Sequence, residues 1–118
     1  DVHCAGVKAR AESLSGGNLQ KFLVGREVLA EPGVLLVNQP TWGVDVGASA
    51  AIRNALIALR ARGCAILVVS EEIDELFELA DRLMVMAAQR LSPAVAAHSL
   101  QVEELGRWMA GRWPRVGR

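Results

Sequence analysis

The sequence predicts an α/β fold, mainly a parallel sheet flanked by helices, and three observations lead to that class. Short, continuous apolar runs occur at Val34–Val37 and Ala65–Val69, as in strands that are buried on both faces of a parallel sheet. Segments with helical spacing of apolar residues lie before, between and after these runs. Pro32, Gly33 and Gly63 mark the ends of those segments. The alternation of strands and helices favours parallel pairing through right-handed crossovers.

Three helices are expected around these strands. The first begins after Ser15, which can act as its N-cap, and ends near Ala30. The second is predicted over Ala48–Arg62 and the third over Glu72–Ala80, where Ser70 can serve as the cap. The residues expected to face inward from the second and third helices are Ile52, Leu56, Leu59, Ile73, Leu76, Phe77 and Ala80.

The C-terminal part is expected to extend the sheet and then close with a helix. Leu83–Met86 has the length of a third strand, and Ala87–Ala97 is predicted to form a hairpin that turns around Ser92–Pro93. A last helix is predicted over Leu100–Ala110. Trp108 of that helix is expected to pack against Trp113.

Composition limits the classes of function. The chain has 118 residues, of which 52% are hydrophobic and 22% charged, so it has the character of a folded domain rather than a disordered tail. Basic and acidic residues number 13 each, which argues against general electrostatic binding of nucleic acid or anionic lipid. The two cysteines, Cys4 and Cys64, lie in unlike contexts and predict neither a disulfide framework nor a thiolate metal site. A sheet of so few strands would leave an apolar face uncovered, which predicts a fragment of a larger domain that could self-associate.

Ser15-Gly16-Gly17 is a candidate anion site, because it stands where a helix begins. Backbone N–H groups at a helix N-terminus have no intrahelical partner, and the helix dipole favours negative charge there. Glycines permit a phosphate to approach the backbone closely, and the Ser15 hydroxyl can add a donor. An ordinary helix cap explains the same three residues, so the triplet by itself leaves both interpretations open.

Asn38 and Gln39 follow directly after the first predicted strand. The carboxyl ends of parallel strands face the ligand crevice in this fold class, so polar side chains there can meet a phosphate-bound metal or a water. A loop that needs polar side chains to satisfy its backbone is the alternative explanation of these two residues.

Taken together, four segments resemble the motifs of the ATP-binding cassette (ABC) transporter ATPases. Leu14–Lys21 resembles the signature motif, Val34–Pro40 the Walker B strand, Gly43–Gly47 the D-loop and Val68–Glu72 the switch segment. The Asn-Leu-Gln-Lys, Gln-Pro-Thr and Asp-Val-Gly-Ala runs are most similar to the importer ATPases for simple sugars and nucleosides, in which two cassettes are fused in one chain. The resemblance extends from about Ser13 to Met86 and suggests the C-terminal half of the second cassette.

The resemblance implies a partial P-loop NTPase domain that lacks its Walker A half. Nothing in the chain matches Gly-x-x-x-x-Gly-Lys-Ser/Thr, the loop that holds the nucleotide phosphates, so this polypeptide alone is expected to be inactive and to bind ATP weakly. For the complete transporter, the resemblance implies ATP and Mg²⁺ as cofactors and a second cassette that shares the ATP. It also implies transmembrane permease subunits as partners, an indirect link to a solute-binding protein, no nucleic acid, and a peripheral position on the cytoplasmic face of the membrane.

Three residues depart from the family pattern at the positions that carry chemistry. Asn38 replaces the Walker B Asp that helps to hold Mg²⁺, and Gln39 replaces the catalytic Glu that polarises water. Glu71 replaces the switch His and would bring negative charge towards a γ-phosphate. This cassette's own hydrolytic site is therefore expected to be degenerate. The residues at positions that bind nucleotide in the family are Ser15, Gly16, Gly17, Gln20 and Asp45.

Two other functions stay open on the sequence alone. The three replacements favour a non-catalytic interaction or regulatory module derived from an ABC cassette, whereas the intact signature argues against wholesale decay of the site. A soluble ABC-type ATPase is the other alternative, although the importer-like runs argue against it.

Trp42 stands where this group would have Arg and is either a partner-facing contact or partly packed against the next helix.

Overall fold

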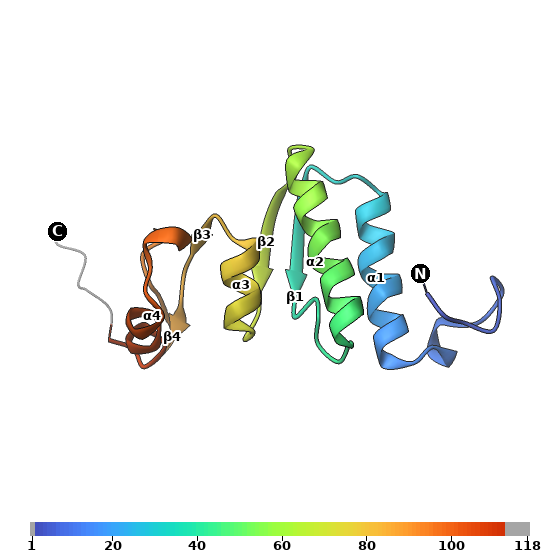
Figure 1. The fold of residues 1–118 in the computed structure, drawn as a ribbon, viewed down its shortest axis with the longest axis horizontal. Coiled ribbons are helices and arrows are strands. Elements are labelled where there is room, and N and C mark those ends of the chain that lie inside the picture. Colours follow the sequence, from blue (N-terminus) through green and yellow to red (C-terminus); the bar gives the residue numbers. More distant parts are fainter. Residues whose placement is uncertain (1, 113–118) are drawn as a thin grey trace. The chain divides into compact units, whose positions relative to one another are not determined.

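A computed structural model describes residues 2–112 and separates the chain into two compact units, Asp1–Glu75 and Leu76–Arg118. The first unit contains two long helices and a pair of parallel strands (Figure 1). Its elements are the short 3-10 helix η1 (Ala11–Ser13), α1 (Gly16–Leu29), β1 (Val34–Asn38), α2 (Val46–Ala61) and β2 (Ala65–Val69). Helix α3 (Ile73–Leu79) crosses the boundary between the units along the chain.

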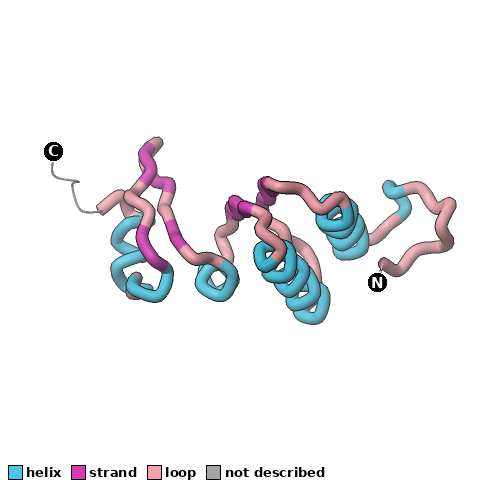
Figure 2. Tube along the Cα trace, turned by 90° about the horizontal axis from the view of Figure 1, so that it is seen from above, coloured by secondary structure: helices cyan, strands magenta, loops and turns pink. Residues whose placement is uncertain are grey.

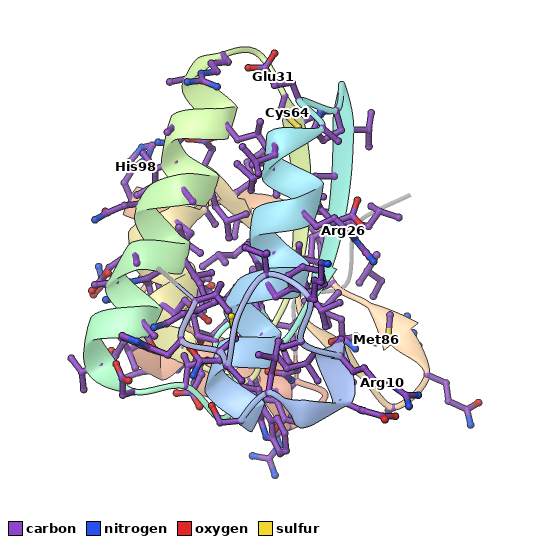
Figure 3. The ribbon with its side chains drawn as sticks, turned by 90° about the vertical axis from the view of Figure 1, so that its right-hand side faces the viewer. Arg10, Arg26, Glu31, Cys64, Met86 and His98 are labelled. Atoms are coloured by element: carbon purple, nitrogen blue, oxygen red, sulfur yellow. The ribbon has the colours of Figure 1, made fainter. Side chains whose placement is uncertain are left out.

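Helix α1 begins and ends where the sequence predicts. Ser15 is its N-cap, and the Ser15 Oγ accepts a hydrogen bond from the Asn18 N–H at 3.3 Å. The helix closes at Ala30, and Glu31 then adopts a φ of 48° ahead of Pro32, which cannot continue a helix. Glu31 pairs with Arg62 at 3.0 Å on the surface. Figure 3 shows Glu31 at the same end of the unit as Cys64, which precedes β2.

Helix α2 supplies most of the core of the first unit. It begins at Val46 rather than at Ala48, because Asp45 takes the cap position and its Oδ1 accepts from the Ala48 N–H at 2.8 Å. Its end is confirmed by Gly63, whose φ of 93° suits a residue without a side chain. The predicted inward face is also confirmed, with Ile52, Leu56 and Leu59 all buried.

Strands β1 and β2 pair in parallel, as predicted, and α2 is the connection between them. The register runs from Val34 opposite Ala65 to Asn38 opposite Val69. Both strands therefore end at the same edge, and this edge carries the polar residues that follow β1.

The prediction that these strands are buried on both faces is wrong. In β1, Leu35 is 5% exposed, whereas Val34 and Leu36 are 67% and 70% exposed. In β2, Leu67 and Val69 are 50% and 55% exposed. Figure 2 shows the reason: α1 and α2 lie on one side of the β1–β2 pair. The expected uncovered apolar face is thus present, and we call Val34, Leu36, Leu67 and Val69 the bare sheet face.

We expect the isolated chain to self-associate through the bare sheet face. Leu36 and Leu67 are direct neighbours in the parallel register, so Leu36→Lys combined with Leu67→Lys places two charges at its centre. This pair should raise the dissociation constant for self-association at least about tenfold, as measured by sedimentation velocity over a concentration series. Leu29→Lys, at a residue 84% exposed on α1, is the matched control and should leave the association unchanged. Equal association of all three chains would contradict this role of the face.

The second unit is built from short antiparallel pairs, and the predicted third parallel strand is wrong. Its elements after α3 are β3 (Arg82–Leu83), β4 (Met86–Ala87), β5 (Arg90–Leu91), β6 (Val95–Ala96), the 3-10 helix η2 (Ala97–Ser99) and α4 (Val102–Met109). Strand β3 pairs with β6 and β4 pairs with β5, both antiparallel. The run Leu83–Met86 is broken because the Val85 N–H donates to the Ser92 Oγ at 2.8 Å, a side chain rather than a neighbouring strand.

The hairpin of the second unit turns at a different place from the one predicted. Ala88 and Gln89 have φ values of 50° and 60°, the pair of positive angles that a tight two-residue turn requires. Ser92 is 4% exposed instead of lying at a turn. Its N–H donates to the Val85 carbonyl at 2.8 Å, so Ser92 closes the hairpin from within.

The last helix is shorter than predicted. Leu105 and Trp108 face inward with exposures of 6% and 3%, whereas Val102 and Met109 are half exposed or more. Trp113, the predicted packing partner of Trp108, lies outside the described residues. Among residues 2–112, no helix combines the length and the apolar character required to cross a bilayer.

Candidate functional site

The N-terminus of α1 has the local geometry of an anion site. Ser15 and Gly16 are exposed, and a Cβ added to Gly16 would meet no atom within 4 Å. The Asn18 N–H is satisfied by the Ser15 Oγ, and the Leu19 N–H donates to the Ser15 carbonyl at 2.8 Å. Helix geometry leaves the N–H groups of Gly16 and Gly17 without intrahelical partners, so both can point at an anion. The residues present therefore fit a phosphate group.

The first turn of α1 lies against the loop that follows β1. A Cβ built on Gly17 would stand 3.7 Å from the Gly43 carbonyl oxygen and 3.8 Å from the Val44 Cα. Gly43 itself has a φ of 73°, a conformation that side chains disfavour. The segment that resembles the signature motif and the segment that resembles the D-loop are thus brought together.

Gln20, one of the predicted nucleotide-binding residues, directs its side-chain amide into the protein. Its Nε2 donates to the Gln39 carbonyl at 3.1 Å and to the Pro40 carbonyl at 2.7 Å. Pro40 is almost fully buried. Gln20 therefore joins α1 to the end of β1.

Gln39 and Glu71, which are predicted to share the hydrolytic site, lie next to each other. The Gln39 N–H continues the sheet ladder to the Val69 carbonyl at 2.7 Å, and the Gln39 Oε1 accepts from the Glu71 N–H at 3.4 Å. Gln39 adopts a φ of 51°, which costs a residue with a side chain about 1–2 kcal/mol. Such strain is concentrated at functional positions, where the surrounding structure holds it in place.

The donor set at the end of β1 fits magnesium poorly. Asn38 is exposed at the last position of the strand and offers a neutral amide, and Gln39 offers another. Mg²⁺ prefers oxygen ligands and is held in proteins chiefly by carboxylates and phosphates. This pair of amides can bind or orient a water but supplies neither the charge of a Walker B carboxylate nor a strong proton acceptor.

Asp45 and Trp42 occupy the loop between β1 and α2. The Asp45 Oδ1 is engaged in capping α2, and it lies 3.4 Å from the position of a Cβ on Gly47. Asp45 thus fixes the start of α2, with its side chain still exposed at the surface. Trp42 is 77% exposed, so its ring is placed as a surface aromatic and not as a residue packed against α2.

A buried carboxylate that the sequence analysis did not single out supports the loop carrying Glu71. Glu75 is 4% exposed, and its Oε2 accepts from the Ser70 Oγ at 3.2 Å. The same hydroxyl accepts from the Glu72 N–H at 3.0 Å. Within residues 2–112, the Glu75 Oε1 has no hydrogen-bond partner. Glu75 shares a helix face with the buried Leu79, as i and i+4, and neither belongs to the inward face that the sequence predicts for this helix.

Comparison with known proteins gives a consistent group of relatives. A nucleoside import ATP-binding protein of Lactococcus lactis is 42% identical over 94% of this chain and 22% of its own length. A glucose import ATP-binding protein of Haloferax volcanii is 40% identical over 87% of this chain and 19% of its own. A guanosine import ATP-binding protein of Bacillus subtilis is 40% identical over 94% and 22%. No family model matches the chain.

A solved structure supports the same relationship. The ATP-binding cassette MJ1267 of an ABC transporter superposes with a TM-score of 0.64 and 25% identity, covering 86% of this chain and 38% of that one. This chain spans about a fifth of the length of the curated relatives it matches. Its fold is accordingly part of a P-loop NTPase of the ABC ATPase type. Over most of its length the chain is similar to ATP-binding proteins of ABC transporters, and the curated relatives named above are nucleoside, glucose and guanosine import ATP-binding proteins.

Proposed function

We propose that this chain is the C-terminal half of an ABC cassette, within the ATP-hydrolysing subunit of a sugar or nucleoside importer. In this proposal the Ser15 turn completes the ATP site of a partner cassette. The observation that carries it is the exposed N-terminus of α1, where Gly16 and Gly17 leave the backbone open to a phosphate. The names of the relatives supply the solute class, nucleosides and sugars.

The chemistry assigned to this turn is charge stabilisation. The amides of Gly16 and Gly17, together with the dipole of the 14-residue helix α1, would stabilise the negative charge on a γ-phosphate held by the partner cassette. The Ser15 hydroxyl can rotate to donate to the same group. The ATP and Mg²⁺ of this site would be held mainly by the partner's phosphate loop.

We propose that this cassette's own site hydrolyses ATP poorly. Asn38 supplies no charge for a metal, and Gln39 can orient a water but is a weak base. Glu71, whose N–H donates to Gln39, would place a carboxylate near the same phosphate. The two ATP sites of the transporter would therefore be unequal, and the 118-residue chain would be inactive by itself.

The proposed assembly sets the partners and the location of the subunit. The cassette would associate with transmembrane permease subunits on the cytoplasmic face of the membrane, and a solute-binding protein would act on it only through them.

A regulatory module without an ATP-dependent interface is the second candidate, favoured by Asn38, Gln39 and Glu71. A soluble ABC-type ATPase is the third, and co-purification with membrane subunits would exclude it.

Protection of the Ser15 turn by nucleotide tests this proposal in the complete transporter. Ser15→Cys is introduced with Cys4→Ser, because Cys4 is exposed and would react as well. A non-hydrolysable ATP analogue with Mg²⁺ should slow maleimide labelling of the introduced cysteine at least about tenfold, because the partner site covers the turn. Glu12→Cys, at an exposed residue of η1, is the control and should stay reactive. Labelling of Ser15→Cys at the same rate with and without nucleotide would support the regulatory module instead.

A further inference from the structure

Gln20 stands five residues after Ser15, yet its side chain is directed towards a different part of the molecule. Its Nε2 lies 3.1 Å from the Gln39 carbonyl oxygen and 2.7 Å from that of Pro40. Carbonyl oxygens can only accept, so the amide must present its nitrogen to both and donates there. We infer that Gln20 is a positioning residue, which fixes the Ser15 turn to the end of β1 and acts on the nucleotide only through that turn.

At the end of β1, the backbone carbonyl groups of Gln39 and Pro40 accept hydrogen bonds from a side-chain donor. Pro40 has no N–H and is almost fully buried, and Gln39 is held at a φ of 51°. The Gln39 carbonyl also accepts from the Trp42 N–H at 3.1 Å. Buried backbone carbonyls need partners, and Gln20 brings its donor from a helix that lies about twenty residues earlier in the chain.

The same face of α1 lies near the same loop at its first turn. Gly17 precedes Gln20 by three residues, so the two lie one above the other on the helix. Gly17 lies near Gly43 and Val44, with room for little more than a Cβ between them, and the two bonds of Gln20 are the attachment of α1 to this loop. With the loop close to its first turn and hydrogen-bonded to Gln20, α1 has its N-terminal turn positioned relative to the end of β1.

This inference rests on the proposed function, since the Ser15 turn matters for hydrolysis only if it meets a phosphate. A displacement of about 1 Å at a catalytic group can lower a rate about a hundredfold. The end of β1 also carries Asn38 and Gln39. One hydrogen-bonded unit therefore joins this cassette's own site to the turn that it offers to its partner.

Substitutions that change the donor and keep the bulk of Gln20 provide the test, in the complete transporter. Gln20→Met keeps the length of the side chain without a donor, and Gln20→Asn keeps the amide but withdraws it by one methylene. We expect both to lower kcat per assembled transporter about tenfold or more and to leave KM for ATP within about twofold, because affinity comes mainly from the partner's phosphate loop. Gln20→Lys restores a donor and should recover kcat to within about threefold of the wild type.

Arg26→Met on the same helix is the matched control. Arg26 is exposed and pairs with its neighbour Glu27 at 2.8 Å, so its replacement should change neither kcat nor KM. A kcat within about twofold of the wild type for both Gln20→Met and Gln20→Asn would overturn the inference, as would a change confined to KM, which would place the side chain on the nucleotide. A lysine variant as impaired as the methionine variant would overturn it too.

Failure of the inference and failure of the proposed function give different results. If nucleotide protects Ser15→Cys from maleimide while Gln20→Met is fully active, the turn meets the nucleotide without help from Gln20. If nucleotide gives no protection, the proposed interface is absent whatever the Gln20 variants do.

Discussion

Replacing Ser15 by arginine is expected to reduce ATP hydrolysis by the complete transporter at least about a hundredfold. The change removes the side chain that caps α1, which accepts from the Asn18 N–H. It also sets a long side chain at the exposed end of the helix, where a phosphate has to approach the amides of Gly16 and Gly17. The rate of phosphate release by the purified transporter is the measurement. The lost cap by itself costs only about 1 kcal/mol, so the protein should still fold.

Gln39→Ala is the control that shows whether the loss of ATP hydrolysis in Ser15→Arg comes from the partner's ATP site rather than from this cassette's own site. If this cassette's own site is degenerate, removing the Gln39 side chain should change total hydrolysis less than about twofold, since Gln is already a poor base. The bonds that Gln20 makes to the Gln39 and Pro40 carbonyls use backbone atoms and survive this change. Equal damage from Ser15→Arg and Gln39→Ala would show that both sites hydrolyse ATP and would end the proposed asymmetry.

Leu56→Ala should lower the free energy of unfolding of the chain by about 3 kcal/mol, within the range of about 2–5 kcal/mol typical of buried leucines. Leu56 is 2% exposed and lies in the middle of α2, on the inward face that also carries Ile52 and Leu59. Truncation to alanine leaves a cavity in the core of the first unit. Helices cover only one side of the β1–β2 pair, so few other buried side chains stabilise this unit. Urea denaturation followed by circular dichroism measures the change.

Leu29→Ala tests whether burial is the cause. Leu29 ends α1 and is 84% exposed, so the same substitution there removes almost no packing. We expect a change below about 0.5 kcal/mol, as for ordinary surface positions. Similar losses at Leu29 and Leu56 would mean that the packing of α2 does not control the stability of this unit.

The first unit could be predicted from the sequence because its signals are local. Ser15 and Pro32 bracket α1, and Gly63 ends α2, each through backbone chemistry that needs no distant partner. The inward face of α2 follows from spacing alone. The coverage of the strands could be predicted only in part: the small number of strands indicated an uncovered apolar face, but the apolar runs themselves predicted burial on both faces, because an apolar strand looks the same whether or not its second face has a partner.

The second unit was harder to predict, for reasons that are equally physical. Its strands have two residues each, too short to show any period. Ser92–Pro93 has the composition of a turn, but the Ser92 hydroxyl is used inside the hairpin to bind Val85. The turn forms at Ala88 and Gln89, residues whose positive φ is favoured by the closure of the hairpin and not by their own preference.

The residues of the candidate site stay a prediction, and the structure tests only how they are placed. The motifs indicated that Gln39 and Glu71 belong together, and the structure places them in contact. Composition gives no indication that Gln20 turns inwards, since an amide can face a ligand or a carbonyl equally well. Glu75 was missed because acidic residues on a short helix are usually solvated.

The bare sheet face should let this chain bind fluorescent dyes in a way usually taken as a sign of incomplete folding. Fluorescent dyes such as ANS brighten on exposed apolar surface, and compact intermediates are recognised in that way. Val34, Leu36, Leu67 and Val69 offer such a surface while α1 and α2 are fully formed. Dye fluorescence from this polypeptide would therefore report an uncovered layer of a native arrangement and not a molten state.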